Sequence, residues 1–176
     1  DRVQGLHRAA SDWQAEHGTL ADAIGHAVAA GDAEAAADLI ERALPEARRR
    51  RHDRVIRDWL QALPDEVVRR RPVLSTQQAW LRLSEGDLEG VEVSLHHAEQ
   101  ALEAMSPDSQ GTASGDDQLR TLSAWIAIYR ASAAQARGDT DATAEHARRA
   151  LELAGPEDHF ARGGAAGFLG LAAWAD

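Results

Sequence analysis

The chain has 176 residues, 44% of them hydrophobic, and a formal net charge of −10 at pH 7. It contains no cysteine and no lysine, which excludes disulfide scaffolds, thiolate metal sites, the lysine-containing phosphate loop and lysine-dependent catalysis. The acidic excess is concentrated in residues 77–176, where 7 arginines face 16 acids, so direct binding to a nucleic-acid backbone is disfavoured.

Alanine is the commonest residue, with 37 copies, and it favours helix over strand. Apolar residues recur at spacings of three and four, the pattern of amphipathic helices. We therefore expect an all-α chain. The predicted helices cover residues 1–17, 20–30, 33–51, 53–62, 65–71, 73–85, 88–104, 118–137, 140–154 and 159–175.

A glycine followed by a polar residue separates several of these helices. The four pairs are Gly18-Thr19, Gly31-Asp32, Gly86-Asp87 and Gly138-Asp139. Glycine can close one helix and the polar side chain can cap the next, so each pair predicts a helix hairpin.

The helices that follow these four glycines share a pattern. Positions five, nine and twelve after each glycine carry a small or apolar residue, and position twelve is always alanine. Small residues at fixed positions let neighbouring helices approach closely, as stacked helical repeats require. We predict a right-handed superhelical stack of antiparallel helix hairpins, forming one domain over residues 1–176.

One stretch interrupts the helical pattern. Residues 106–118, "SPDSQGTASGDDQ", are rich in serine, glycine and aspartate, and we expect a mobile loop there. The chain opens on Asp1 and stops within an apolar helical pattern, so we expect it to be a fragment of a longer protein.

Two segments resemble a known repeat. "RGDTDATAEHARRALELAGP" is similar to the second half of a tetratricopeptide repeat (TPR), and "EGDLEGVEVSLHHAEQAL" resembles it more loosely. The glycines at 31, 86 and 138 are 55 and 52 residues apart rather than 34, so the resemblance implies a degenerate, TPR-like solenoid.

The whole chain resembles the TPR-like region of MalT-like, large ATP-binding LuxR-type transcription regulators. The strings "LHRAASDW", "AIGHAVAAGD" and "LPDEV" carry most of this similarity. It implies a sensor and interaction region whose parent binds ATP and DNA through separate domains. It also implies no cofactor within this chain and partners among the parent's other domains, together with a small-molecule or protein effector.

Aromatic and basic residues supply the candidate binding sites. The first helices of stacked hairpins line a concave face, where an indole can stack on a ligand or clasp a peptide. The candidates for ligand or partner binding are Trp80, Arg82, Trp125 and Tyr129. The alternative is that these large rings fill gaps between alanine-rich helices.

Arginine runs are candidates for interdomain contact, and we select Arg50, Arg54 and Arg57. The alternative is that arginines at helix ends, such as Arg69 to Arg71, complement the helix dipole.

No catalytic or metal signature is present. Glu92 and His96 share a helix face, but the chain lacks HExxH or a similar string, so we expect neither catalysis nor a metal site. No apolar run approaches the roughly 20 residues of a membrane span, and we expect a cytoplasmic protein. The predicted function is a non-catalytic sensing domain of a transcription regulator; the alternative is a TPR-like scaffold that binds a partner peptide in a signalling or secretion complex.

Overall fold

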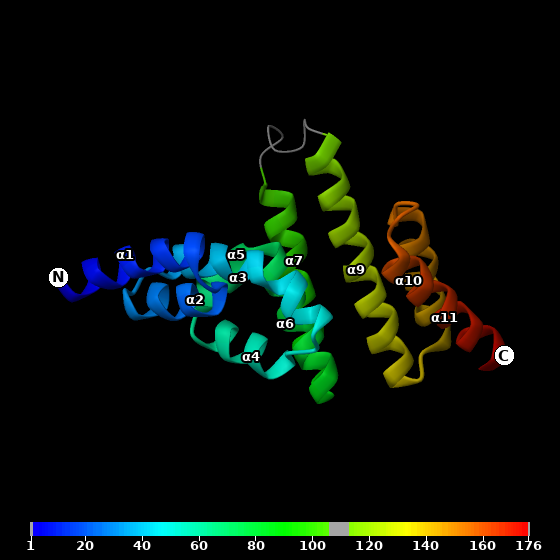
Figure 1. The fold of residues 1–176 in the computed structure, drawn as a ribbon. Helices are drawn as coiled ribbons and strands as arrows, with labels where there is room; N and C mark the ends of the chain where they lie inside the picture. Colours follow the sequence, from blue (N-terminus) through cyan, green and yellow to red (C-terminus); the bar gives the residue numbers. More distant parts are fainter. Residues whose placement is uncertain (1, 106–112, 176) are drawn as a thin grey trace. The chain divides into compact units, whose positions relative to one another are not determined.

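The computed structural model describes residues 2–105 and 113–175, with side chains for all of these except residues 113–119. Within these residues every regular element is a helix (Figure 1). The helices are α1 (Arg2–His17), α2 (Leu20–Ala29), α3 (Ala33–Arg49), α4 (Asp53–Gln61), α5 (Asp65–Arg70), α6 (Pro72–Glu85), α7 (Leu88–Ala104), α9 (Ala113–Arg137), α10 (Thr140–Leu153) and α11 (His159–Ala175). The prediction of an all-α chain is confirmed.

The helix boundaries follow the sequence pattern closely, with one exception. Helix α9 begins at Ala113, so residues 113–118 are helical where the sequence predicts a loop. The remainder of that predicted loop, residues 106–112, lies outside the described residues.

The hairpin turns explain where several helices end. Gly31, Gly86 and Gly138 have φ of 71°, 79° and 76°, in the left-handed region that glycine tolerates best. Each glycine lets two backbone N–H groups return to carbonyls of the preceding helix; for Gly31 these bonds are Gly31 N to Val28 O and Asp32 N to Ala27 O. Gly18 also follows the end of a helix, since α1 ends at His17, but its φ is not positive and its N–H bonds to Gln14 O.

The polar residue after each glycine caps the next helix as predicted. The side chains of Thr19, Asp32, Asp87 and Asp139 each accept a hydrogen bond from the backbone N–H three residues later. Such a cap stabilises a helix start by about 1 kcal/mol.

The shared register of the four helices after the glycines is confirmed by burial. All residues at positions five, nine and twelve are at most 6% exposed. They are Ala23, Ala27, Ala30, Ala36, Ile40, Ala43, Val91, Leu95, Ala98, Thr143, Ala147 and Ala150. The pattern therefore marks the face by which each helix packs.

The chain divides into two compact units, with the boundary between Leu74 and Ser75 inside α6. Two predictions, a single domain and a superhelical stack, depend on how these two units are arranged relative to each other. Both stay predictions. In the first unit, α2 packs between α1 and α3, and α4 and α5 pack on α3. Its largest fully buried side chains are aliphatic: Ile24, Ile40, Ile56, Val68 and Leu74.

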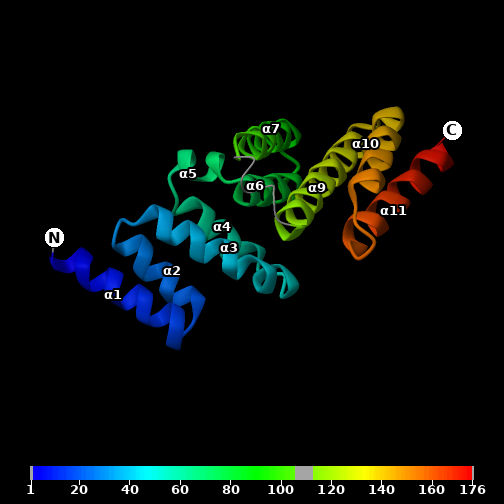
Figure 2. The same ribbon diagram turned by 90° about the horizontal axis from the view of Figure 1, so that it is seen from above.

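In the second unit, α9, α10 and α11 lie side by side and alternate in direction (Figure 2), and α7 packs on α9. Its core combines alanines with aliphatic residues such as Val91 and Leu95, and with Tyr129, which is 1% exposed. Gly164 shows how closely these helices approach, because a Cβ there would lie 3.3 Å from Ile128 Cδ1 on α9.

Candidate functional site

Three of the four predicted binding residues belong to one aromatic cluster in the second unit. The ring centroids of Trp80 and Tyr129 are 5.8 Å apart, and those of Trp125 and Phe160 are 5.2 Å apart. Tyr129 also lies 6.4 Å from Phe160, edge to face, which links the two pairs. Sequence reasoning overlooked Phe160, because it lies on α11, a helix not considered as part of the binding face.

The four rings of the cluster differ in how far they are exposed to solvent. Tyr129 is 1% exposed, so its placement matches the packing alternative. Trp80 and Trp125 are half-buried, whereas Phe160 is 45% exposed. Edge-to-face contacts of this kind add about 1 kcal/mol beyond area burial. The cluster therefore joins α6, α9 and α11, and the binding roles of its residues stay predictions.

Arg82, the fourth predicted residue, is engaged in the hairpin between α6 and α7. Its Nη1 donates a hydrogen bond of 2.9 Å to the carbonyl oxygen of Gly90. The absence of a side chain at Gly90 makes room for this contact, since a Cβ there would lie 2.8 Å from Arg82 Cδ. Arg82 thus ties the end of α6 to the first turn of α7.

A pocket of about 420 Å³ lies beside the aromatic cluster. The residues that line it are Arg120 and Thr121 of α9, and Gly155, Pro156, Glu157 and Asp158 between α10 and α11. The Trp125 indole donates to Asp158 Oδ1 at 3.4 Å, so one predicted residue supports the pocket wall.

The two carboxylate oxygens of Asp158 have different surroundings. Its Oδ1 also accepts from the backbone N–H of Ala161, which caps α11. Its Oδ2 is buried and has no hydrogen-bond partner among the described residues. A guanidinium and a carboxylate on opposite elements can bind a small polar molecule that carries both an acceptor and a donor. Sequence reasoning missed this pair because Arg120 and Asp158 are distant in the chain; the cap pattern of Asp158 before α11 was the available signal.

The arginines selected for interdomain contact lie at the end of α3 and on α4. Arg50 Nε lies 2.5 Å from Glu46 Oε1, one turn earlier in the same helix. Arg54 is exposed and Arg57 is half-buried. These contacts do not test an interdomain role, so it stays a prediction.

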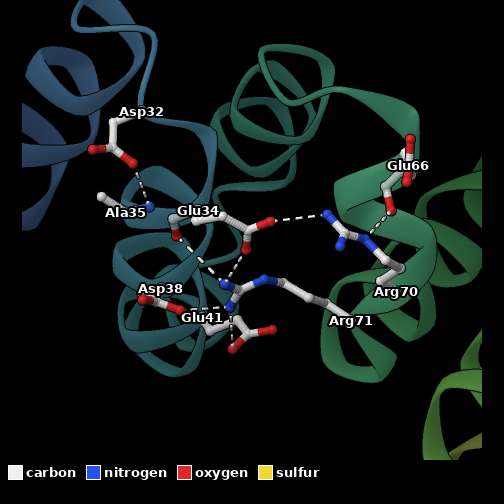
Figure 3. A network of polar contacts seen from close by, with 8 residues as sticks. All are labelled: Asp32, Glu34, Ala35, Asp38, Glu41, Glu66, Arg70 and Arg71. Carbon is white, nitrogen blue, oxygen red and sulfur yellow. Dashed lines mark hydrogen bonds and ion pairs between the residues drawn. The ribbon is translucent and has the colours of Figure 1, made fainter. Parts of the chain in front are cut away.

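A polar network in the first unit surrounds Arg71 (Figure 3). Its guanidinium lies 2.8 Å from Glu34 Oε2, 2.6 Å from Asp38 Oδ1 and 3.4 Å from Glu41 Oε2, all on α3. Arg70 adds a 3.0 Å contact to Glu34 Oε1. The arginine run at the end of α5 therefore binds the chain's own carboxylates, and these arginines tie the end of α5 to α3.

The environment shifts the titration of two groups in this network. Burial raises the pKa of Glu41 above its ordinary value of 4.5, and the positive charge of Arg71 only partly opposes this. Burial would lower the pKa of Arg71, but its hydrogen bonds to Glu34 and Asp38 raise it overall. Arg71 is therefore charged at every accessible pH.

A second arginine network joins α7 to α9. Arg130 Nη1 and Nη2 contact the two oxygens of Glu99 at 2.5 and 2.8 Å, and its Nε lies 3.5 Å from Glu92. Hydrogen bonding to Glu99 raises the pKa of Arg130, against the opposing effect of burial. Arg137 completes the network by contacting Glu92 Oε1 at 3.4 Å and the carbonyl of Leu88 at 2.9 Å.

No group of three or more His, Cys, Asp or Glu side chains among the described residues is arranged to hold a metal ion. None of the helices described is both long enough and apolar enough to cross a membrane.

Comparison with known proteins gives distant similarity to two kinds of large protein. The HTH-type transcriptional regulator MalT of Serratia proteamaculans is 29% identical over 160 residues, which is 91% of this chain and 17% of MalT. The serine/threonine-protein kinase PknK is 38% identical over 82 residues, both in Mycobacterium tuberculosis and in Mycobacterium bovis. That match covers 47% of this chain and 7% of PknK.

No family model matches the chain. No solved structure matches it significantly. The chain spans less than a fifth of the length of either relative. Over most of its length, this all-helical chain is thus distantly related to the transcriptional regulator MalT.

Proposed function

We propose that this chain is a non-catalytic sensing and protein-interaction module of a MalT-like, LuxR-type transcription regulator. The observation that carries the proposal is the alignment with MalT across 91% of the chain, together with the all-helical fold. In this proposal the hairpins form a TPR-like, right-handed superhelix in the cytoplasm. ATP and DNA bind to other domains of the parent protein, and this module needs no cofactor.

The proposed effector site is the pocket beside the aromatic cluster. Arg120 would bind an anionic or acceptor group, and the carboxylate of Asp158, which lines the same pocket, would accept a hydrogen bond from a donor group of the effector. An effector changes the parent's activity only if it binds the active and inactive arrangements with different affinity.

The similarity to PknK supports the alternative function of a docking module. PknK is named a kinase and MalT a transcriptional regulator, yet both share sequence with this chain. A module that binds a partner peptide, and catalyses nothing itself, fits both proteins.

Calorimetric titration of the intact parent with candidate small-molecule effectors, with and without ATP, tests the proposal. We expect binding that is tighter in one nucleotide state and that weakens at least tenfold in Arg120→Gln. Arg162→Gln is the matched control, because Arg162 is exposed on α11 and does not line the pocket. Equal affinity in both nucleotide states contradicts sensing, and equal effects of the two variants contradict the pocket.

A further inference from the structure

Helix α1 is held on α2 by an unusually polar face. Its one buried residue is Ser11, whose hydroxyl donates a 2.9 Å hydrogen bond to the carbonyl oxygen of Ala23 on α2. The large apolar side chains of α1 lie elsewhere, because Val3, Leu6 and Trp13 are each more than half exposed. Few apolar contacts therefore hold α1, and its docking depends on a small number of polar contacts.

One of these contacts joins two histidines. The Nδ1 atoms of His7 on α1 and His26 on α2 are 3.0 Å apart, and the ring centroids are 5.3 Å apart. Both rings are half-buried. A hydrogen bond between two ring nitrogens needs one N–H donor and one lone pair. The contact therefore forms when both imidazoles are neutral or when only one carries a charge.

The charged groups near the two histidines interact with other residues and not with the imidazole rings. On α1, Arg8 follows His7 and its Nε lies 3.3 Å from Asp32 Oδ2, the cap of α3. On α2, Asp22 lies one turn before His26, and its carboxylate accepts from the hydroxyl of Thr19. Within the described part of the chain, no ion pair joins either imidazole to a carboxylate.

We propose that His7 and His26 form a pH-sensitive latch that fastens α1 to α2 and opens when both imidazoles are protonated. Two imidazolium rings both donate at Nδ1, so neither accepts, and their like charges repel at this distance. The latch therefore stays closed only while at least one of the two Nδ1 atoms keeps a lone pair that can accept the hydrogen bond.

The direction of the pH dependence follows from proton counting. The open state binds two protons and the closed state binds at most one, so acid favours opening. Histidine is the side chain whose charge most often changes between pH 5 and 8. With one extra proton taken up on opening, the open fraction rises by about tenfold between pH 7.5 and 5.0. Opening also separates Ser11 from its acceptor at Ala23, so the helix is released as a whole.

Hydrogen exchange of the full chain, read by mass spectrometry on peptides within residues 2–17, tests the latch. Exchange is corrected for its intrinsic pH dependence, and we expect the protection of α1 to fall about tenfold from pH 7.5 to 5.0. In His26→Asn and in His7→Asn, an amide can replace one ring nitrogen without titrating, so the fall should be below about twofold.

The control is His96→Gln, because His96 is exposed on α7 in the second unit. This variant should retain the wild-type fall. The wild-type measurement by itself decides the matter if a variant does not fold, since unchanged α1 protection at pH 5.0 overturns the latch. An equal fall in wild type and in both asparagine variants overturns it as well. The latch is independent of the pocket and of the proposed effector.

Discussion

Helices α3 and α7 begin in the same way but are held by different kinds of ionic contact. Each follows a left-handed glycine and an aspartate cap, and each presents carboxylates to arginines from another element. On α3, Arg71 faces three carboxylates at once. On α7, Arg130 meets Glu99 through two parallel hydrogen bonds.

We infer from this difference that the number of nearby charges is a poor measure of how firmly a helix is held. The carboxylates around Arg71 repel one another, and Glu34 and Asp38 are more than half exposed. Arg130 is 24% exposed and Glu99 37%, and their paired geometry is the stronger kind of charge-assisted contact. Exposed ion pairs contribute little because water and salt screen them.

The largest expected effect tests this directly by removing one carboxylate from each network. Glu99→Gln should lower the free energy of unfolding by about 2 kcal/mol, because Arg130 loses its paired acceptor while half-buried. Glu34→Gln should cost under about 0.5 kcal/mol, because Asp38 and Glu41 still face Arg71. Urea unfolding followed by circular dichroism measures both. Equal costs for the two variants would show that geometry is not the deciding factor.

A smaller effect concerns the glycine turns that α3 and α7 share. Gly31→Ala and Gly86→Ala should each cost about 1 kcal/mol, because both residues have positive φ. The control is Gly25→Ala within α2, where a Cβ meets nothing within 4 Å and alanine should stabilise by about 1 kcal/mol. Thermal unfolding of the three variants compares them, and destabilisation by Gly25→Ala would refute the backbone explanation.

At the end of α3 the opposite substitution, to glycine instead of from glycine, tests the same backbone effect. Arg51 has φ of 57° and returns its N–H to Arg48 O, so it occupies the left-handed position that glycine fills in the other turns. Arg51→Gly should stabilise the chain by about 0.5 kcal/mol, since relief of strain exceeds the added freedom of the unfolded chain. Thermal unfolding alongside Arg42→Gly, which places glycine inside α3 at an exposed arginine, measures this. A loss of stability in Arg51→Gly would contradict the assigned strain.

The smallest effect concerns Glu41, whose pKa burial raises. A raised pKa means that the protonated form is favoured in the folded state. The stability gained by protonation is present below the ordinary value of 4.5 and is lost as pH rises through the folded value. Glu41→Gln should therefore raise stability at pH 7, by under about 0.5 kcal/mol, and wild type should gain relative to it as pH falls from 7 to 4. Urea unfolding at both pH values measures the difference; a relative loss for wild type would reverse the assigned direction.

Much of the fold could be predicted because its signals are local. The caps at Asp32, Asp87 and Asp139 and the left-handed glycines before them act within one turn of the chain. The buried register five, nine and twelve residues after each glycine follows from helix periodicity alone. The left-handed conformation of Arg51 could not be predicted, because no sequence pattern identifies a non-glycine residue that adopts positive φ.

The candidate site could be predicted only in part. The Trp125 indole contacts Asp158 at the edge of a pocket, but its predicted binding role stays a prediction, and the pocket itself joins residues almost 40 positions apart. The buried Tyr129 could not be told from the half-buried Trp80 by sequence, because both occupy helix faces of similar composition.

The amino-acid sequence by itself determined the helices, their caps and the faces that they bury, since alanine content, periodicity and capping chemistry act over a few residues. Only the tertiary structure decided which arginine meets which carboxylate, and which two histidines touch. In the two arginine networks and the histidine pair these contacts join residues 19 to 45 positions apart, and they depend on how helices pack and how much water packing removes.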